Sequence, residues 1–254
     1  MNKSRKSNVT CVKRKISKEV KQDQQELITC IIMCDCPGHR MKSYGPPSLM
    51  YIDKNIRLID SQIKIINSFF DNVEIIVCVG FESEKIISHI SECHSDKNIR
   101  IVENVQHEQT NSCETLRIAL NNTWNSKVVY IDGNIHIDKT TLKKIKINKS
   151  CVMVSEHNKN SEIGVNISDN NVEFFSFGAL HEWQNIFYVS EKSVLQSLKS
   201  IVSKESYRCK FVFEALNELV SNVGANITAV FNDKPPININ KIKKVAAQKH
   251  RRNK

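Results

Sequence analysis

Short apolar runs rich in β-branched residues alternate with amphipathic stretches along the first half of the chain, and this alternation limits the possible folds more than any other feature. Residues 74–79 read Glu-Ile-Ile-Val-Cys-Val and stop at Gly80, as expected of a strand covered on both faces. Residues 56–70 carry apolar side chains at helical spacing, and Ser83 is a candidate N-cap. Strands are predicted at residues 26–33, 74–79, 99–103 and 128–131, and helices at 56–70, 83–90 and 112–121.

The second half of the chain has shorter strands around polar turns, predicted at residues 151–155, 164–167, 172–176, 186–189 and 227–231, with helices at 192–201 and 211–220. No internal repeat is evident. Strand–turn–helix alternation predicts a sheet flanked by helices. We therefore expect an α/β protein with a three-layer, Rossmann-like, mostly parallel mixed sheet and helices on both faces.

Basic residues concentrate at the two ends of the chain. The formal charge of the 254 residues is +10, yet the segment between the ends is mildly acidic. This pattern predicts a flexible basic arm over residues 1–25, one domain over 26–245 and a basic tail over 246–254. Such ends are usually solvated, and contact with nucleic acid or an acidic protein is the alternative.

The nine cysteines lie mostly within apolar segments and have no framework spacing, which is typical of a reduced protein. The first residues are polar, and no apolar run has the length of a membrane span. These features predict a cytoplasmic protein without membrane contact. The abundance of Asn, Ile and Lys indicates an AT-rich coding source, such as a virus. Zinc ligation by Cys30, Cys34, Cys36 and His39, with Cys93-His94 elsewhere, is an alternative for which the spacing is unfavourable.

A tight turn and a group of cations follow the first strand. Pro37-Gly38 ends the apolar run, and Arg40 and Lys42 come directly after it. A turn at the end of a buried strand aims backbone N–H groups at one point, where nearby cations attract phosphate. The segment therefore predicts a phosphate site at the carboxyl edge of the sheet.

Two further strand ends carry polar residues. Asn104 is followed by Thr110-Asn111-Ser112 at the start of a helix, which offers donors to a base or a phosphate, or simply caps the helix through Thr110 or Ser112. Asp132-Gly133-Asn134 ends the strand at 128–131 and is either a turn or a Mg²⁺ site. Asn238 is a further amide that could serve the metal.

In this order, the segments resemble the sugar-phosphate and phosphocholine nucleotidyltransferases. Residues 33–41 are similar to that family's opening Leu-Ala-Ala-Gly-x-Gly-x-Arg-Met, and residues 77–81 to its Val-x-Val-Gly-Tyr/Phe. Residues 103–116 are similar to the Asn-x-x-Tyr-x-x-Thr-Asn…Ser-Leu run of the choline-phosphate branch. Residues 130–134 look like its Asp-Gly-Asp metal motif, and Ile237-Asn238 like its late metal position.

The resemblance implies transfer of a nucleoside monophosphate from a nucleoside triphosphate to a phosphorylated small molecule, with release of pyrophosphate and with Mg²⁺ as cofactor. Its implied catalytic residues are Arg40, Lys42 and Asp132. The implied nucleotide-binding residues are Cys36, Gly38, His39, Gly80, Asn104, Thr110, Asn111 and Ser112. Asp132, Asn134 and Asn238 would hold the metal. Apart from the resemblance, the mix of polar and aromatic residues between predicted strands makes Glu182, Trp183 and Asn185 candidates for facing the acceptor substrate.

Three departures from the family pattern fall at positions with a role in binding or catalysis. Cys36 replaces the first glycine of the opening turn, Asn134 replaces the second aspartate of the metal motif, and Pro47 replaces the catalytic lysine. Lys42 or Lys54 would have to supply the missing cation. The alternative is a catalytically degenerate member that binds a nucleotide or a partner without turnover.

Overall fold

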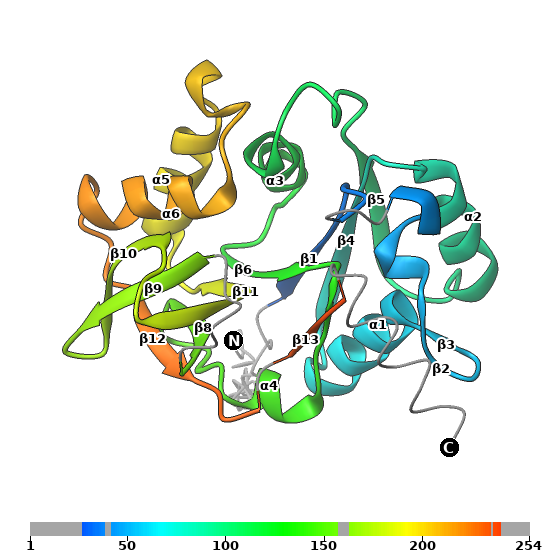
Figure 1. Ribbon diagram of the computed structural model, residues 1–254, viewed down its shortest axis with the longest axis horizontal. Helices are drawn as coiled ribbons and strands as arrows, with labels where there is room; N and C mark the ends of the chain where they lie inside the picture. Colours follow the sequence, from blue (N-terminus) through cyan, green and yellow to red (C-terminus); the bar gives the residue numbers. More distant parts are fainter. Residues whose placement is uncertain (1–26, 39–41, 157–162, 235, 240–254) are drawn as a thin grey trace, which may run out of the picture.

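The computed structural model of the protein describes residues 27–38, 42–156, 163–234 and 236–239. These residues form a nine-stranded sheet with helices on both faces (Figure 1). The strand order is β5-β4-β1-β6-β11-β8-β12-β10-β9. The predicted three-layer α/β class is confirmed, while the predicted ends at residues 1–25 and 246–254 lie outside the described residues.

The sheet strands are β1 (Ile28–Cys34), β4 (Val73–Val79), β5 (Ile99–Glu103), β6 (Lys127–Asp132), β8 (Cys151–Ser155), β9 (Ile163–Ser168), β10 (Asn171–Phe177), β11 (His181–Val189) and β12 (Thr228–Phe231). Two small pairs lie apart from it, β2 (Tyr51–Asp53) with β3 (Ile56–Arg57), and β7 (Ile135–His136) with β13 (Ile237–Asn238). The helices are α1 (Leu58–Phe69), α2 (Ser83–Cys93), α3 (Ser112–Asn121), α4 (Lys139–Lys143), α5 (Lys192–Val202) and α6 (Val212–Ser221).

The first four strands of the sheet run parallel and end at one edge. Met33 of β1 pairs with Asp132 of β6, and Cys34 pairs with Val79 of β4. Val79 in turn pairs with Glu103 of β5. The carboxyl ends of β5, β4, β1 and β6 therefore meet at one edge, where open α/β sheets bind ligands.

The second half of the sheet is mixed. β11 runs antiparallel to both β6 and β8, whereas β8 and β12 are parallel. β11 begins at His181, earlier than the predicted 186–189, because its polar first residues pair with β9 and the end of β8. A register shift between Trp183 and Phe187 interrupts this strand.

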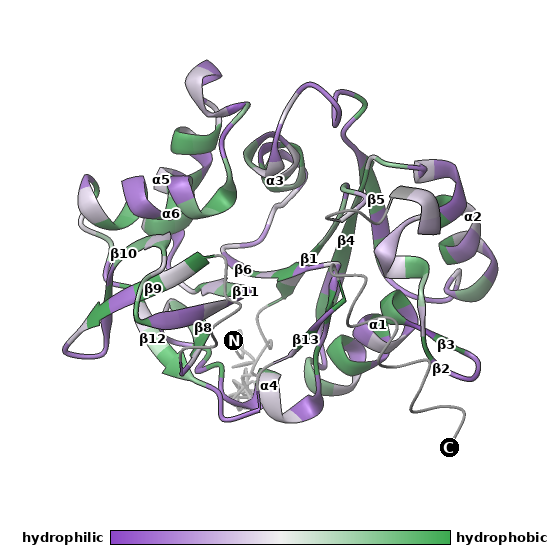
Figure 2. Ribbon diagram, in the orientation of Figure 1, coloured by the Kyte–Doolittle hydropathy of each residue, from purple (hydrophilic) through white to green (hydrophobic). Residues whose placement is uncertain are grey.

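Two apolar cores lie on opposite faces of the sheet, because successive side chains of a strand point in opposite directions. Ile31 and Met33 of β1 belong to one core, which α3, α5 and α6 cover. Cys30 and Ile32 belong to the other, which α1, α2 and α4 cover. Figure 2 shows the central strands in the colours of hydrophobic residues along their length. Double coverage explains why these strands are continuously apolar in sequence.

Several element boundaries differ from the sequence prediction. Residues 56–57 form β3, and the helix predicted from 56 begins at Leu58. Ser83 is the first residue of α2, and its expected capping role is wrong: the N-cap position belongs to Glu82, which makes no side-chain cap. β2, β7, β13 and α4 were not predicted, because strands of two or three residues and a five-residue helix are too short for a periodic pattern.

None of the helices within the described ranges combines the length and the apolar character that spanning a bilayer requires.

Gly133 allows the turn after β6 to press against the end of β1. Its backbone N–H donates to the Met33 carbonyl oxygen at 2.8 Å. A Cβ built on Gly133 would lie 2.6 Å from Cys34 Sγ and closer still to the Met33 oxygen. Most of this contact is with backbone, which cannot move aside by a change of rotamer. Only glycine fits at this position without displacing one of the two strands.

We expect Gly133→Ala to lower the free energy of unfolding by about 1–3 kcal/mol through this overlap, as measured by denaturant titration. The matched control is Gly178→Asn, since a Cβ at Gly178 meets nothing within 4 Å and asparagine tolerates its positive φ. Equal losses in the two variants would show that the contact at Gly133 is not tight.

Candidate functional site

A cavity of about 340 Å³ opens at the carboxyl ends of β1 and β6. The segment before α3 and the start of α6 supply further parts of its wall, which contains His107 and Val212. Eight residues predicted for the site from the sequence line this cavity: Cys36, Thr110, Asn111, Ser112, Asp132, Asn134, Trp183 and Asn185. Side chains from distant parts of the sequence thus share one space.

Asp132 ends β6 and is fixed from two sides. Its Oδ1 accepts a hydrogen bond from the Asn134 backbone N–H at 2.9 Å. On the α1 side of the sheet, the buried Gln62 donates its Nε2 to the carbonyl oxygens of Asp132 at 3.0 Å and Ile135 at 2.8 Å. Burial raises the pKa of the Asp132 carboxyl to about 7, and the nearby charge of Asp35 adds to the rise.

Asp35 is a second carboxylate in the wall of this cavity, one that the sequence prediction missed. It is only 8% exposed, and its Oδ2 accepts a hydrogen bond from Thr115 Oγ1 of α3 at 2.6 Å. Burial raises the pKa of Asp35 as well, although the Thr115 hydrogen bond opposes the rise. The rule that selected Asp132, a carboxylate directly after a buried strand, applies equally to Asp35 after β1.

Asn104 organises the segment before α3 from beneath. It is 2% exposed and does not line the cavity. Its Nδ2 donates to Thr110 Oγ1 at 3.0 Å and Thr115 Oγ1 at 2.9 Å, and its Oδ1 accepts from the Gln106 backbone N–H. Asn104 therefore positions Thr110 and, through Thr115, the Asp35 carboxylate.

Asn111 is the residue that caps α3. Its side chain accepts from the Ser112 backbone N–H at 2.8 Å. The alternative in which Thr110 or Ser112 caps the helix is wrong: Ser112 Oγ accepts from the Val212 backbone N–H, and Thr110 Oγ1 donates to the Gln106 carbonyl oxygen. Capping does not remove Asn111 from the cavity wall.

Aromatic side chains form a further part of the cavity wall. Phe211 and Phe213 stack at 5.9 Å between ring centroids, and Phe177 meets Phe213 edge-to-face. All three line the cavity with Trp183. Phe177 and Phe211 are 71% and 49% exposed. The sequence prediction missed these phenylalanines, because isolated aromatic residues in strands and at helix starts are usually part of a core.

Asn185 reaches the cavity through an irregularity in β11. It has a φ of +55°, inside the stretch where the register of β11 shifts. Such a bulge turns a side chain away from the regular alternation of a strand. Its neighbour Glu182 pairs with Ser155 and Gly164 within the sheet and does not line the cavity.

Other predicted site residues lie near the cavity without lining it. Gly80 is buried, where a Cβ would lie 2.8 Å from both the Asp35 carbonyl oxygen and His107 Cβ, so it permits close packing behind the wall. Gly38 has a φ of +73° in the turn after β1.

Asn238 of β13 pairs with Ile135 of β7, beside the turn that carries Asp132. His39 and Arg40 lie outside the described residues, and Lys42 is the first residue of the 3₁₀ turn Lys42–Tyr44.

The cysteine-rich zinc alternative is not formed by the described residues. Cys30 and Cys34 are buried in β1, and the thiol of Cys36 accepts from Asn134 Nδ2 at 3.5 Å. Within the described part of the chain, the convergent group of potential ligands is Asp60, His89 and His94. His39 of the proposed set lies outside that part.

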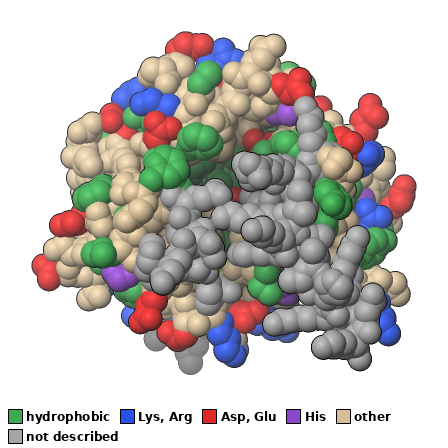
Figure 3. Space-filling view, viewed as in Figure 1, with side chains coloured by type: hydrophobic (Ala, Val, Ile, Leu, Met, Phe, Trp, Pro, Cys, Tyr) green, Lys and Arg blue, Asp and Glu red, His purple; other side chains and the backbone are tan. Residues whose placement is uncertain are grey.

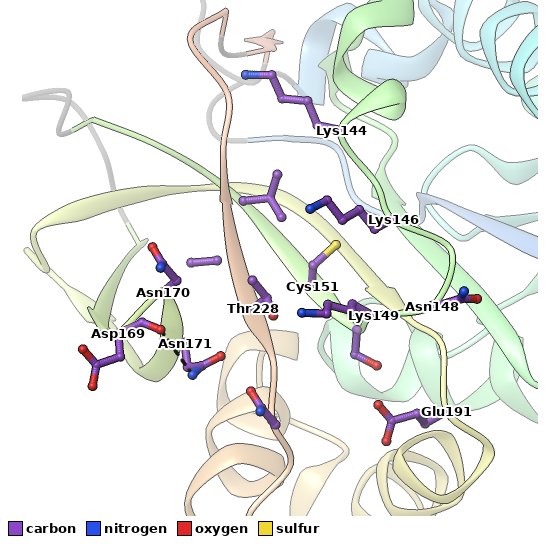
Figure 4. A pocket seen from close by; sticks show the side chains of 14 residues that line it. Lys144, Lys146, Asn148, Lys149, Cys151, Asp169, Asn170, Asn171, Glu191 and Thr228 are labelled. Atoms are coloured by element: carbon purple, nitrogen blue, oxygen red, sulfur yellow. Dashed lines mark hydrogen bonds between the residues drawn. The ribbon is translucent and has the colours of Figure 1, made fainter.

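A second cavity, of about 730 Å³, lies at the opposite edge of the sheet, around the starts of β8 and β12. Figure 4 shows Lys146 and Lys149 beside it, with Asn170 and Asn171 across from them. Lys144 at its rim is paired with Asp233 at 3.1 Å. This cavity is basic and polar, but it gathers none of the sequence-predicted site residues.

The cavity at the strand ends is acidic. Asp35 and Asp132 both line it, and the described part of its wall contains no lysine or arginine. Buried carboxylates are normally paired or bound to a metal. Figure 3 shows charges of both signs scattered over the coloured part of the face in view, with no large area of one sign.

Comparison with solved structures identifies the fold. CTP:phosphocholine cytidylyltransferase from Streptococcus pneumoniae matches with a TM-score of 0.71 and 13% sequence identity, over 88% of this chain and 98% of that one. The chain has the nucleotidyltransferase fold. A nucleoside-diphosphate-sugar pyrophosphorylase from Vibrio cholerae RC9 matches with a TM-score of 0.68 and 10% identity, over 87% and 98% of the two chains.

The inositol-1-phosphate CTP transferase from T. maritima matches with a TM-score of 0.63 and 13% identity, over 87% of this chain and 94% of that one. No protein-family model and no curated protein matches the sequence. At identities this low, the structural matches establish the fold and no more. The resemblance seen in the motifs is consistent with that fold.

The raised pKa of Asp132 predicts a pH-dependent stability. The folded protein holds the Asp132 proton up to about pH 7, whereas the unfolded chain loses it near pH 4. Asp132 therefore stabilises the fold most below about pH 4, and this contribution is lost as the pH rises to about 7. In the absence of metal, we expect Asp132 to make the unfolding free energy of the wild type fall by on the order of 2 kcal/mol over this pH range. The Asp132→Asn variant should lack this fall. This fall is smaller than the pKa difference alone would give, because water reaches the partly exposed Asp132 side chain.

Denaturant titrations at several pH values, in the presence of a chelator, measure the unfolding free energies of the wild type and of Asp132→Asn. Asp96→Asn is the control, because Asp96 is an exposed carboxylate between α2 and β5. A pH dependence that is the same in the wild type and in Asp132→Asn would show that Asp132 titrates normally.

Proposed function

We propose that this protein transfers a nucleoside monophosphate from a nucleoside triphosphate to a phosphorylated small molecule and releases pyrophosphate. The observation that carries the proposal is the convergence of Asp35, Asp132 and Asn111 on one cavity at the carboxyl edge of parallel strands. Ligands bind at this edge in open α/β sheets, and the nucleotidyltransferase fold is consistent with such a ligand.

Asp35 and Asp132 fit the needs of Mg²⁺, which is commonly held by one or two carboxylates together with substrate phosphates. Both are carboxylates at strand ends, and the described wall offers them no lysine or arginine. When bound there, Mg²⁺ would offset the charge of the phosphates. Asn134 lies beside them in the wall, and Asn238 is the more distant candidate.

The remaining roles follow the positions of the side chains. Thr110, Asn111 and Ser112 offer polar groups to the base or ribose from the start of α3. We assign Arg40 and Lys42 to charge neutralisation at the phosphates, as the motif resemblance implies. Catalysis would then depend on positioning and on charge stabilisation.

The aromatic wall suggests which acceptor the site takes. Trp183, Phe177, Phe211 and Phe213 line the cavity with Asn185, and the faces of aromatic rings attract quaternary ammonium groups. A sugar phosphate would instead need several polar partners for its hydroxyl groups. We therefore propose a phosphocholine-like acceptor in preference to a sugar phosphate.

Two departures from the family pattern favour a second candidate, a fold that binds a nucleotide without turnover. Pro47, at the position where the family has a lysine, is buried at the start of the 3₁₀ turn Pro47–Leu49 and offers no cation. Asn134 also leaves the motif after β6 with Asp132 as its one carboxylate. In the active version, Asp35 supplies the second carboxylate.

Calorimetry with CTP, UTP, ATP and GTP in Mg²⁺, followed by pyrophosphate release with phosphocholine or a sugar phosphate, tests the proposal. We expect binding of one or more nucleotides and release that depends on an acceptor. Asp132→Asn should lower turnover by roughly 10²–10³-fold, and Asp35→Asn should lower it in the same direction. Asp96→Asn is the control for loss of a carboxylate.

Binding without pyrophosphate release would favour the second candidate. Absence of both binding and release would contradict both versions. Full activity of Asp132→Asn would exclude the assigned cavity as the site of transfer.

A further inference from the structure

Three side chains on the α1–α2 side of the molecule converge at a point outside the cavity. His89 Nε2 and His94 Nε2 each lie 2.7 Å from the same oxygen, Oδ1 of Asp60. None of the three residues lines the cavity at the strand ends. The cluster is therefore separate from the proposed transfer site.

The backbone explains how two histidines five positions apart reach one oxygen. Within a regular helix, such side chains point roughly 140° apart. His89 lies inside α2, but His94 is the residue that ends it, with φ −136° and ψ 23°. This departure from helical geometry turns the His94 ring back toward His89, and the ring centroids lie 6.1 Å apart.

Asp60 is presented by the first turn of α1. Its Oδ2 accepts from the Arg57 backbone N–H at 3.1 Å, which leaves Oδ1 to the two histidines. The side chains of Asp60, His89 and His94 are 23%, 11% and 14% exposed. The cluster is thus held in place by both helices, yet water can reach it.

We propose that Asp60, His89 and His94 bind a divalent transition-metal ion of the zinc type. Two imidazole nitrogens and one carboxylate oxygen are a known zinc ligand set, with water in the open fourth position. The candidate ligand atoms all lie within 4.8 Å of one another. A tetrahedral zinc site needs about 3.3 Å between ligand atoms, so each 2.7 Å pair has to open by about half an ångström.

Cys93 contacts the second ring nitrogen of His89. Its Sγ lies 3.7 Å from His89 Nδ1, on the ring nitrogen that faces away from Asp60. A metal at Nε2 places the proton of the neutral ring on Nδ1, where the sulfur is within reach as a weak acceptor. The ion would join the start of α1 to the end of α2. Both helices pack on the same face of the sheet.

Hydrogen bonds from both imidazoles to Asp60 also satisfy these groups without an ion, so the test has to separate the two states. His89→Gln/His94→Gln serves this purpose, since glutamine still donates a hydrogen bond to Asp60 but is a poor zinc ligand. His136→Gln, in β7, is the matched control. Circular dichroism and melting of the metal-free proteins establish that each variant folds.

The full-length chain, stripped with a chelator, is titrated with Zn²⁺ by calorimetry and with Co²⁺ by visible absorption. We expect one Zn²⁺ equivalent and a Co²⁺ spectrum of four-coordinate type, together with a higher melting temperature in Zn²⁺. The double variant should bind Zn²⁺ more weakly than the wild type. We expect its affinity to fall by more than the roughly 10–100-fold that loss of an outer-shell partner costs. His136→Gln should retain it.

Absence of any ion binding in the wild type would overturn the proposal. Equal binding in the wild type and the double variant would also overturn it, and would assign the ion to other residues. Both results are independent of nucleotide binding, so they leave the proposed transferase function untouched.

Discussion

The contact between the end of β1 and the turn after β6 is the constraint on which the candidate site depends. Gly133 donates its N–H to the Met33 carbonyl oxygen at 2.8 Å, and its lack of a Cβ allows the approach. Asp35 and Asp132, far apart in sequence, consequently line one cavity. The two helical layers hold them from opposite faces, through Gln62 of α1 beneath the Asp132 carbonyl and Thr115 of α3 on the Asp35 carboxylate.

The sequence predicts the α/β class and most strands because double coverage leaves a local signal, a continuous apolar run. It does not predict the mixed half equally well. The first residues of β11, His181 to Asn185, are largely polar. Of these, His181 pairs with β9, Trp183 pairs with β8, and Glu182 pairs with both strands. Tertiary contacts determine which strands such polar residues pair with, and the local sequence pattern contains no information about these contacts. The same holds for the two-residue strands β7 and β13.

For the site, strand ends and helix starts are the features that sequence reasoning can find, and Asp132, Asn111 and Thr110 all line the cavity. Asp35 was missed because the resembling motif has alanine at its position, although the strand-end rule applies to it. Asn104 and Gly80 support the wall from behind, a distinction that depends on side-chain packing. The Asp60–His89–His94 cluster escapes a search for helical histidine spacing, since it requires the irregular end of α2.

We assign the nucleotide and the divalent cation to the acidic cavity at the strand ends and not to the larger cavity around Lys149. Crystals grown with a nucleoside triphosphate and Mn²⁺, in place of Mg²⁺, test this directly through the anomalous signal of the manganese. We expect an anomalous peak between the carboxylates of Asp35 and Asp132, with triphosphate density beside it. Nucleotide density in the cavity of Lys146 and Lys149, with no manganese at Asp132, would contradict this assignment.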